Sequence, residues 1–408
     1  MPTPSAKRPP SSVRANRPRA SVAHQADRDA SDEDDPSTDS VGDPEVGDEG
    51  TGGAADRFRA LPPGADPNLD WGLDCHLGPD GQPRIIERRF TVGPEFAGMR
   101  LDHFIKTQIP RLSRTKIQEV ITQTLQRDAA TTVHTAPRGA LRANTRVAVG
   151  EAFTLRRAAR AEPPCPRNIT VVYADDDVLV IDKPAGLPVH STAKFYYNTL
   201  TRIMLETMGP GLQLCHRLDR ETSGVVVVAK HKAAASSVKQ AFAKKTVHKT
   251  YVALVVGHPS WPLVGEGEFA VEAPLHVAQR GDPTQLVGVR MMTEGPGLPS
   301  KTMFAVMGRS AHYSLIRCRP ITGRQHQIRA HLAYAGFPIV GDKIYAHGDQ
   351  AFIDFCDQGW TPERAAEFVL WRHALHAAEV DFPHPDGTRR VVAAPLPADM
   401  ADLFARDS

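Results

Sequence analysis

The sequence predicts an α+β fold: a mixed, mainly antiparallel sheet with flanking helices and a central cleft, preceded by a small α/β domain. Short β-rich apolar runs recur between residues 168 and 400. Helical periodicity is confined to separate stretches, whereas βαβ winding would alternate helices and strands regularly. Two amphipathic stretches near residue 100 precede a Pro-containing linker at 161–168, which predicts a separate N-terminal domain.

Residues 1–66 differ in composition from the rest of the chain. They hold 8 Lys and Arg against 13 Asp and Glu, a net charge of −5, whereas residues 67–408 hold 41 against 34, a net charge of +7. A segment rich in Pro, Ser and Gly buries too little apolar surface to offset the entropy lost on ordering. We expect a disordered charged tail with no part in catalysis, and a basic body that suits a polyanionic partner.

Residues 90–158 are expected to form the small domain. Between residues 99 and 123, two stretches have apolar residues at helical spacing: Leu101, Phe104 and Ile105, then Ile117, Val120 and Ile121. Ser113 has the position of an N-cap for the second helix. The polar face carries Arg100, Arg114 and Lys116. On composition alone such a face is more often solvated than functional.

Residues 168–400 are expected to form the large domain. Residues 169–184 predict a hairpin, 223–230 a buried strand, 231–246 a helix and 247–257 a second strand, on which Lys249 and Tyr251 share one face. The segment 261–298 has a weaker pattern and is interpreted as an enlarged insertion.

Charged residues crowd a turn that leads into the buried strand at 223–230. The stretch His216 to Thr222 includes Arg217 and Asp219, and a loop held by a rigid strand is where catalytic groups often lie. An ion-paired surface turn is the alternative reading of this charge pattern.

A second polar cluster lies on a predicted helix near residue 330. Thr322 and Gln325 have capping-box spacing, which predicts a helix from about Gly323 to Ala335, ended by Gly336. Ile328 and Leu332 form its inward stripe, and Arg329 lies beside them. Its adjoining faces carry Arg324, His326 and His331.

These motifs together resemble the RluA-like pseudouridine synthases in order and spacing. The resemblance rests on IDKPAGLPVH, HRLDRETSG, KTYVALVVG and TGRQHQIRAHLAYAGFPIVGD, and on a similar closing segment after residue 372. The helices at 99–123 resemble the S-four-like RNA-binding domain, although its usual Gly-x-Val-x-Val-Asn-Gly hairpin is absent. The predicted organisation is therefore a tail at 1–66, an S-four-like RNA-binding domain at 90–158 and a synthase domain at 168–400.

The resemblance implies a role for each matching residue. Asp219 would be the catalytic aspartate, Tyr251 the residue that stacks on the target uracil, and Arg329 the partner of that aspartate. Arg217 would fill the place of the flipped nucleotide. Arg324 would contact RNA, as would Arg100, Arg114 and Lys116 of the small domain. Pseudouridine formation replaces the glycosidic bond at N1 of the uracil by a bond at C5. It needs a carboxylate near the anomeric carbon, as nucleophile or as base and electrostatic partner. A stacked base must be flipped out before it can react.

Pseudouridine formation is an internal rearrangement, so we expect no metal, nucleotide or redox cofactor. The expected partner is ribosomal RNA, with transfer RNA as the alternative, and the protein is expected to be a cytoplasmic monomer without a membrane segment. The five scattered cysteines are interpreted as reduced. Two other functions stay open from the sequence: a non-catalytic RNA-binding or assembly factor, and a hydrolase built on Asp219, His216 and Ser223.

Overall fold

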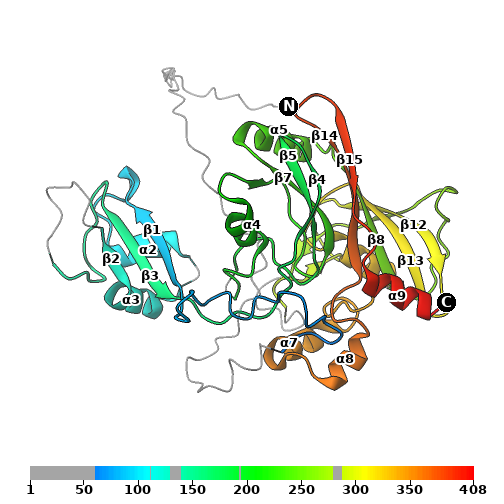
Figure 1. The fold of residues 1–408 in the computed structure, drawn as a ribbon, viewed down its shortest axis with the longest axis horizontal. Helices are drawn as coiled ribbons and strands as arrows, with labels where there is room; N and C mark the ends of the chain where they lie inside the picture. Colours follow the sequence, from blue (N-terminus) through cyan, green and yellow to red (C-terminus); the bar gives the residue numbers. More distant parts are fainter. Residues whose placement is uncertain (1–59, 111, 129–138, 193, 279–286) are drawn as a thin grey trace, which may run out of the picture. The chain divides into compact units, whose positions relative to one another are not determined.

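The computed structural model describes residues 60–408, except 111, 129–138, 193 and 279–286. Most of the predicted tail lies outside these residues. The described chain contains a small domain with a three-stranded sheet and a large domain with a ten-stranded sheet, each of which has its own helices (Figure 1). In the described part of the chain, no helix is long and apolar enough to span a membrane.

The small domain packs two helices on an antiparallel sheet. Its strands, in the order β1-β3-β2, are β1 (Ile85–Thr91), β3 (Ala152–Ala158) and β2 (Leu125–Arg127), and its helices are α2 (Leu101–Gln108) and α3 (Arg114–Gln123). The backbone N–H of Lys116 donates to Ser113 Oγ at 3.2 Å, so the predicted cap is confirmed. The predicted apolar stripes pack against Phe90 and Phe153 in one core. Strand β1 begins five residues before the expected boundary at residue 90.

The large domain is built on a sheet in the order β4-β5-β7-β14-β8-β13-β12-β9, with β15 added beside β14 and β6 beside β7. These strands are β4 (Thr170–Ala174), β5 (Val178–Lys183), β6 (Gln213–Leu214), β7 (Ser223–Ala229), β8 (His248–Val256), β9 (Phe269–Glu272), β12 (Lys301–Arg309), β13 (Tyr313–Pro320), β14 (Leu375–Pro383) and β15 (Arg389–Ala393). Only the β7–β14 pair is parallel among them, so the predicted mixed, mainly antiparallel sheet is confirmed.

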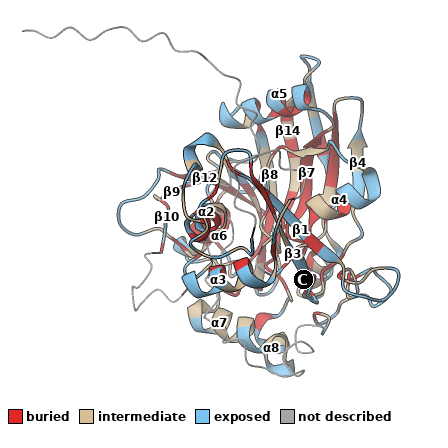
Figure 2. Ribbon diagram, turned by 90° about the vertical axis from the view of Figure 1, so that its left-hand side faces the viewer, coloured by how far each residue is buried: buried red, intermediate tan, exposed pale blue. Residues whose placement is uncertain are grey.

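Strands β7 and β14 form the centre of this sheet. Every residue of β7 is buried (Figure 2). Where the two strands meet, Ser223 and Gly224 lie opposite His376 and Ala377. Gly224 has a φ of +111°, and a Cβ at this position would collide with the backbone of Ala377. The glycine of the Thr-Ser-Gly motif is therefore required for the approach of the two strands.

The large domain has six helices among the described residues: α4 (Leu200–Met208), α5 (Lys232–Ala243), α6 (Gln327–Tyr334), α7 (Gly348–Gln358), α8 (Pro362–Phe368) and α9 (Ala398–Arg406). Apolar residues of α4 and α5 complete a core with β5 and β7, and those of α6 complete a second core with β8, β12 and β13. Helices α7 and α8 lie side by side. The segment 261–298 contributes β9, β10 (His276–Val277) and β11 (Met291–Met292), and its Leu275 and Met291 pack on Ala330 of α6.

Helix α6 begins four residues later than predicted. Its N-cap is His326, in the left-handed conformation at a φ of 50°. Thr322 is not the N-cap: its hydroxyl donates to Gln327 Oε1 at 2.7 Å. The predicted end is right, since Gly336 has a φ of +87°. Ile328 and Leu332 are buried as expected.

Candidate active site

Asp219 lies in the loop between β6 and β7, directly before the buried strand. The backbone N–H of Thr222 donates to the Asp219 carbonyl oxygen at 3.1 Å, which closes the turn. The ammonium of Lys183, fully buried, donates to the carbonyl oxygens of Arg220, Leu187 and Pro184 at 3.1, 2.9 and 2.8 Å. The backbone beside Asp219 is thus fixed, while the Asp219 side chain is 21% exposed. A fixed carboxylate that is still accessible is suited to act on a bound ligand.

Arg329 of α6 joins this carboxylate to a second one. Its Nη1 lies 3.2 Å from Asp219 Oδ2, so the predicted proximity of the two residues is present. Its Nε and Nη2 donate to Oδ2 and Oδ1 of Asp342 at 2.6 and 2.9 Å. Arg329 therefore makes its bidentate contact with Asp342 and donates a single N–H to Asp219. Because Asp342 holds the guanidinium in place, the remaining N–H has a set direction.

Asp342 is a further residue of this cluster, which the sequence reasoning did not single out. It is completely buried and also accepts the backbone N–H groups of Ile344 and Tyr345, at 3.1 and 3.0 Å. Burial by itself would raise its pKa, but the charge and hydrogen bonds of Arg329 outweigh burial and hold the pKa well below its ordinary value. The only sequence signal was its place in the motif FPIVGDKIY.

Tyr345 and His326 complete the surroundings of Arg329. The guanidinium carbon of Arg329 lies 5.1 Å from the centre of the Tyr345 ring, within the range of a cation–π contact. His326 Nε2 lies 3.9 Å from Asp219 Oδ2, and its Nδ1 lies 3.3 Å from the Tyr345 hydroxyl. The left-handed backbone of His326 directs this side chain toward Asp219. The sequence predicted a helix that begins near Gly323, with His326 inside it, and so did not indicate this direction.

Tyr251 lies on β8, on the other side of β14 from Asp219. It pairs with Ala377 of β14 and Cys318 of β13. Burial, followed by the negative charge of Asp219, raises the pKa of Tyr251 well above its ordinary value. The hydroxyl stays protonated and the ring is half-buried.

Lys249 shares the strand face of Tyr251. Its ammonium makes no hydrogen bond or ion pair with any residue that the structure describes, and burial lowers the pKa of this group. The Nζ atom lies close to Gly323, in the turn that precedes α6. The sequence predicted that Lys249 shares a strand face with Tyr251 but did not indicate a function for it.

The predicted RNA-binding residues lie in different surroundings. Arg217 and Arg324 are exposed, in the Asp219 loop and in the turn before α6. In the small domain Arg114 is exposed, Lys116 pairs with Glu119 at 2.8 Å, and Arg100 forms a bidentate ion pair with Asp102, at 3.0 and 2.7 Å. The guanidinium of Arg100, the N-cap residue of α2, is therefore already paired with a carboxylate in the first turn of that helix.

The hydrolase alternative is wrong, because its serine and histidine have other partners. Ser223 Oγ is hydrogen-bonded to His376 Nδ1 at 2.9 Å, and His216 Nε2 accepts the backbone N–H of Val227 at 3.0 Å. Burial lowers the pKa of His216 to about 3, so it is neutral. Among the described residues, no group of three or more His, Cys, Asp or Glu is arranged to hold a metal ion. All five cysteines are free thiols, as expected.

The fold and the Asp219–Arg329 pair define the class of protein. A family model described as RNA pseudouridylate synthase matches residues 177–334, which include Asp219, Tyr251 and Arg329. The chain is 34% identical over 318 residues to the ribosomal large subunit pseudouridine synthase C of Salmonella typhimurium, covering 76% of this chain and 92% of the relative. This protein therefore belongs to the RNA pseudouridylate synthase family.

A second sequence relative agrees with that assignment. The mitochondrial tRNA pseudouridine(32) synthase of Saccharomyces cerevisiae is 39% identical over 191 residues, which are 47% of this chain and 40% of the yeast protein. A solved structure, human RNA pseudouridylate synthase domain containing 1, is 27% identical with a TM-score of 0.44, covering 56% of this chain and 84% of the human one.

Proposed function

We propose that this protein converts uridine to pseudouridine in large-subunit ribosomal RNA, with Asp219 as the catalytic carboxylate. The observation that carries the proposal is the accessible carboxylate of Asp219, held 3.2 Å from the buried guanidinium of Arg329. Ribosomal RNA is favoured over transfer RNA because the Salmonella relative, named for ribosomal RNA, matches along most of both chains, whereas the yeast relative, named for transfer RNA, matches along less than half.

The proposed reaction breaks the bond between N1 of uracil and C1′ of the ribose, and forms a bond between C5 and C1′. The proton on C5 is lost and N1 gains one, so the composition of the RNA does not change. Asp219 acts either as a nucleophile at C1′ or as a base that also stabilises positive charge there. Both routes need the ionised carboxylate, and the N–H of Arg329 stabilises that form and fixes its direction.

The other residues bind and orient the uridine in this proposal. The ring of Tyr251 provides a face for the uracil, a contact of about 1–3 kcal/mol per base. Arg217, exposed in the same loop as Asp219, fills the gap that the flipped nucleotide leaves. Lys249 and Arg324 offer positive charge to the RNA backbone beside the target nucleotide.

The small domain extends the RNA contact, through Arg114 and Lys116 in particular. Arg100 contributes only when Asp102 releases it. We also propose that the protein acts as a monomer without a cofactor, since each step above uses side chains of one chain. Its proposed location is the cytoplasm.

The test compares Asp219→Asn with the wild-type protein on unmodified ribosomal RNA transcripts, with pseudouridine detected by carbodiimide labelling. Asp176→Asn is a matched control, because Asp176 is exposed in the β4–β5 turn. We expect no product from Asp219→Asn and normal product from the control. Product from the Asp219→Asn variant at more than about a hundredth of the wild-type rate, about 2.7 kcal/mol in barrier, would contradict the mechanism. Absence of product from the wild-type protein on every RNA would favour the assembly factor.

A further inference from the structure

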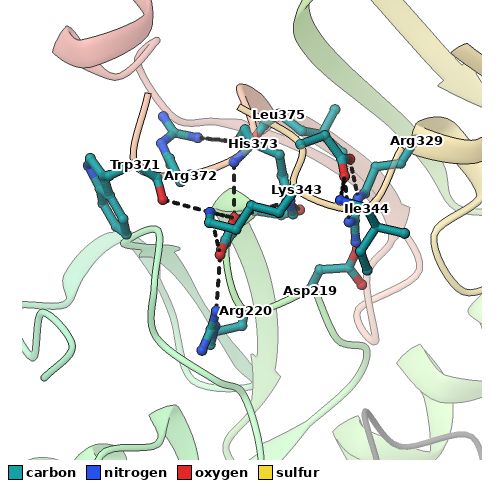
Figure 3. A network of polar contacts seen from close by, with 12 residues as sticks. Asp219, Arg220, Arg329, Lys343, Ile344, Trp371, Arg372, His373 and Leu375 are labelled. Carbon is teal, nitrogen blue, oxygen red and sulfur yellow. Dashed lines mark hydrogen bonds and ion pairs between the residues drawn. The ribbon is translucent and has the colours of Figure 1, made fainter. Parts of the chain in front are cut away.

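Glu221, two residues after Asp219, is the centre of a buried polar network. Figure 3 shows its partners Arg220, Lys343 and His373 together with Asp219. Its Oε1 and Oε2 accept from Lys343 Nζ at 3.0 and 2.9 Å. Its Oε1 also accepts from Arg220 Nη2 at 3.0 Å, and its Oε2 accepts the backbone N–H of His373 at 3.1 Å. The contacts with Lys343 and His373 therefore tie the Asp219 loop to another part of the large domain.

Lys343 is held by three aromatic rings as well as by Glu221. Its Nζ lies 5.0, 5.2 and 5.7 Å from the ring centres of Phe355, Trp360 and Phe368, which belong to α7, α8 and the turn between them. It also donates to the carbonyl oxygen of Trp371 at 2.8 Å. Cation–π contacts and two acceptors fix the ammonium in one position.

Lys343 follows Asp342 directly in the chain. We propose that residues 342 and 343 act together as a positioning element, in which Asp342 orients Arg329 and Lys343 orients the Asp219 loop through Glu221. This inference rests on the proposed function and assigns positioning residues to it. The adjacent Gly341 has a φ of +75°, and a Cβ there would collide with the backbone carbonyl of Arg372, so the chain at 341–343 is closely confined.

The pair differs from an ordinary surface ion pair in its burial. Burial by itself would raise the pKa of Glu221, but Lys343 outweighs it and holds the pKa well below the ordinary value. The side chains of Lys343 and Glu221 are 3% and 11% exposed. A buried pair of this kind often gives less stability than apolar residues of the same size. A gain in orientation of Asp219 accounts for a pair that stability alone does not require.

The experiment separates positioning from stability with a double variant. Glu221→Gln leaves the Lys343 ammonium without its carboxylate, and Lys343→Met leaves Glu221 with Arg220 as its remaining cationic partner, so each single variant should lower Tm. The double variant removes both charges, and methionine fits an aromatic cage, so its Tm should return to near the wild-type value. We measure Tm, single-turnover pseudouridine formation and RNA affinity for each protein. Glu268→Gln, which breaks the Glu268 contacts with Arg317 and Arg319 on β13, is the control for loss of an ion pair.

We expect the double variant to regain Tm but to remain 10- to 100-fold slower than wild type, with RNA affinity within about threefold. The Glu268→Gln control should change Tm without slowing turnover. A double variant with restored Tm and turnover within threefold of wild type would overturn the proposal. If the double variant does not fold, Glu221→Asp decides: it keeps the charge but shortens the side chain by one methylene, and a folded variant at the wild-type rate also overturns positioning. The wild-type protein is assayed first, so its own failure to form product would count against the proposed function instead.

Discussion

Asp342→Asn should be among the most damaging conservative changes in this chain. If the asparagine oxygen keeps the backbone N–H groups of Ile344 and Tyr345, its amide NH₂ takes the place of Oδ2, which now lies 2.6 Å from Arg329 Nε. Two donors then face each other, and Arg329, 7% exposed, keeps only Asp219 as an anion. Breaking a buried ion pair from one side costs about 3–5 kcal/mol. For a domain of this size each kcal/mol lowers Tm by about 2–4 °C, so we expect a loss of about 6–20 °C.

The assay is thermal and urea unfolding of Asp342→Asn beside wild type and Asp349→Asn. Asp349 pairs with Arg290 at 2.6 Å, but Arg290 is 29% exposed, so that control should cost about 1 kcal/mol or less. The pKa of Asp342 is depressed in the folded protein, so its contribution is fully present above the unfolded pKa of about 3.9 and is lost only as pH falls through the folded value. The difference between variant and wild type should therefore be constant from pH 5 to 8. A Tm loss below about 2 °C with normal turnover would refute the reasoning.

Three further predictions concern the same region. Arg329→Lys should fold but turn over about 10- to 100-fold more slowly in a single-turnover assay, because lysine keeps the charge but cannot contact Asp342 and Asp219 together; a wild-type rate would contradict this role. Tyr251→Phe should stay within a few-fold of wild type, while Tyr251→Leu should lose about 5- to 150-fold in kcat/KM, the equivalent of one stacked base; equal effects of the two changes would exclude stacking. Burial lowers the pKa of His373 to about 3 and of His376 to about 4. Below about pH 6.5 only the unfolded chain binds these protons, so stability falls as pH falls, by about 2 kcal/mol for each histidine between pH 7.5 and 5. Urea unfolding of His376→Gln should show a shallower pH dependence, and an unchanged slope would show that His376 does not cause it.

The sequence predicted those parts of the fold in which local pattern and burial agree. Strand β7 is a continuous apolar run, and α5 has an apolar stripe, so each is recognisable without the rest of the chain. The predicted start of α6 was wrong because Thr322 and Gln325 have capping-box spacing without forming a capping box. In the structure Gln327 forms the hydrogen bonds with Thr322 and Lys301. Local spacing does not show that competing tertiary contact.

The site was predictable to the extent that its residues lie in recognisable motifs. Asp219, Tyr251 and Arg329 were found in this way, and the structure brings Asp219 and Arg329 into contact, while their roles stay predictions. Asp342 and Lys343 were not found, because their importance comes from partners more than ten residues away, and a sequence does not display such pairs. Helices α7 and α8 were also missed, although they supply the rings around Lys343.

The position of β14 in the sheet has a consequence for synthesis of the chain. Among the strands that the structure describes, β14 alone pairs with both β7, which follows Asp219, and β8, which carries Tyr251, yet β14 is made more than 100 residues after β8. Until that strand leaves the ribosome, the nascent chain holds two half-sheets, each with an unpaired edge of the kind that recruits other strands. Contacts between segments so distant in sequence also form slowly. Nascent chains halted before Leu375 should therefore aggregate or depend on chaperones, and catalytic competence should arise in one step once β14 has been made.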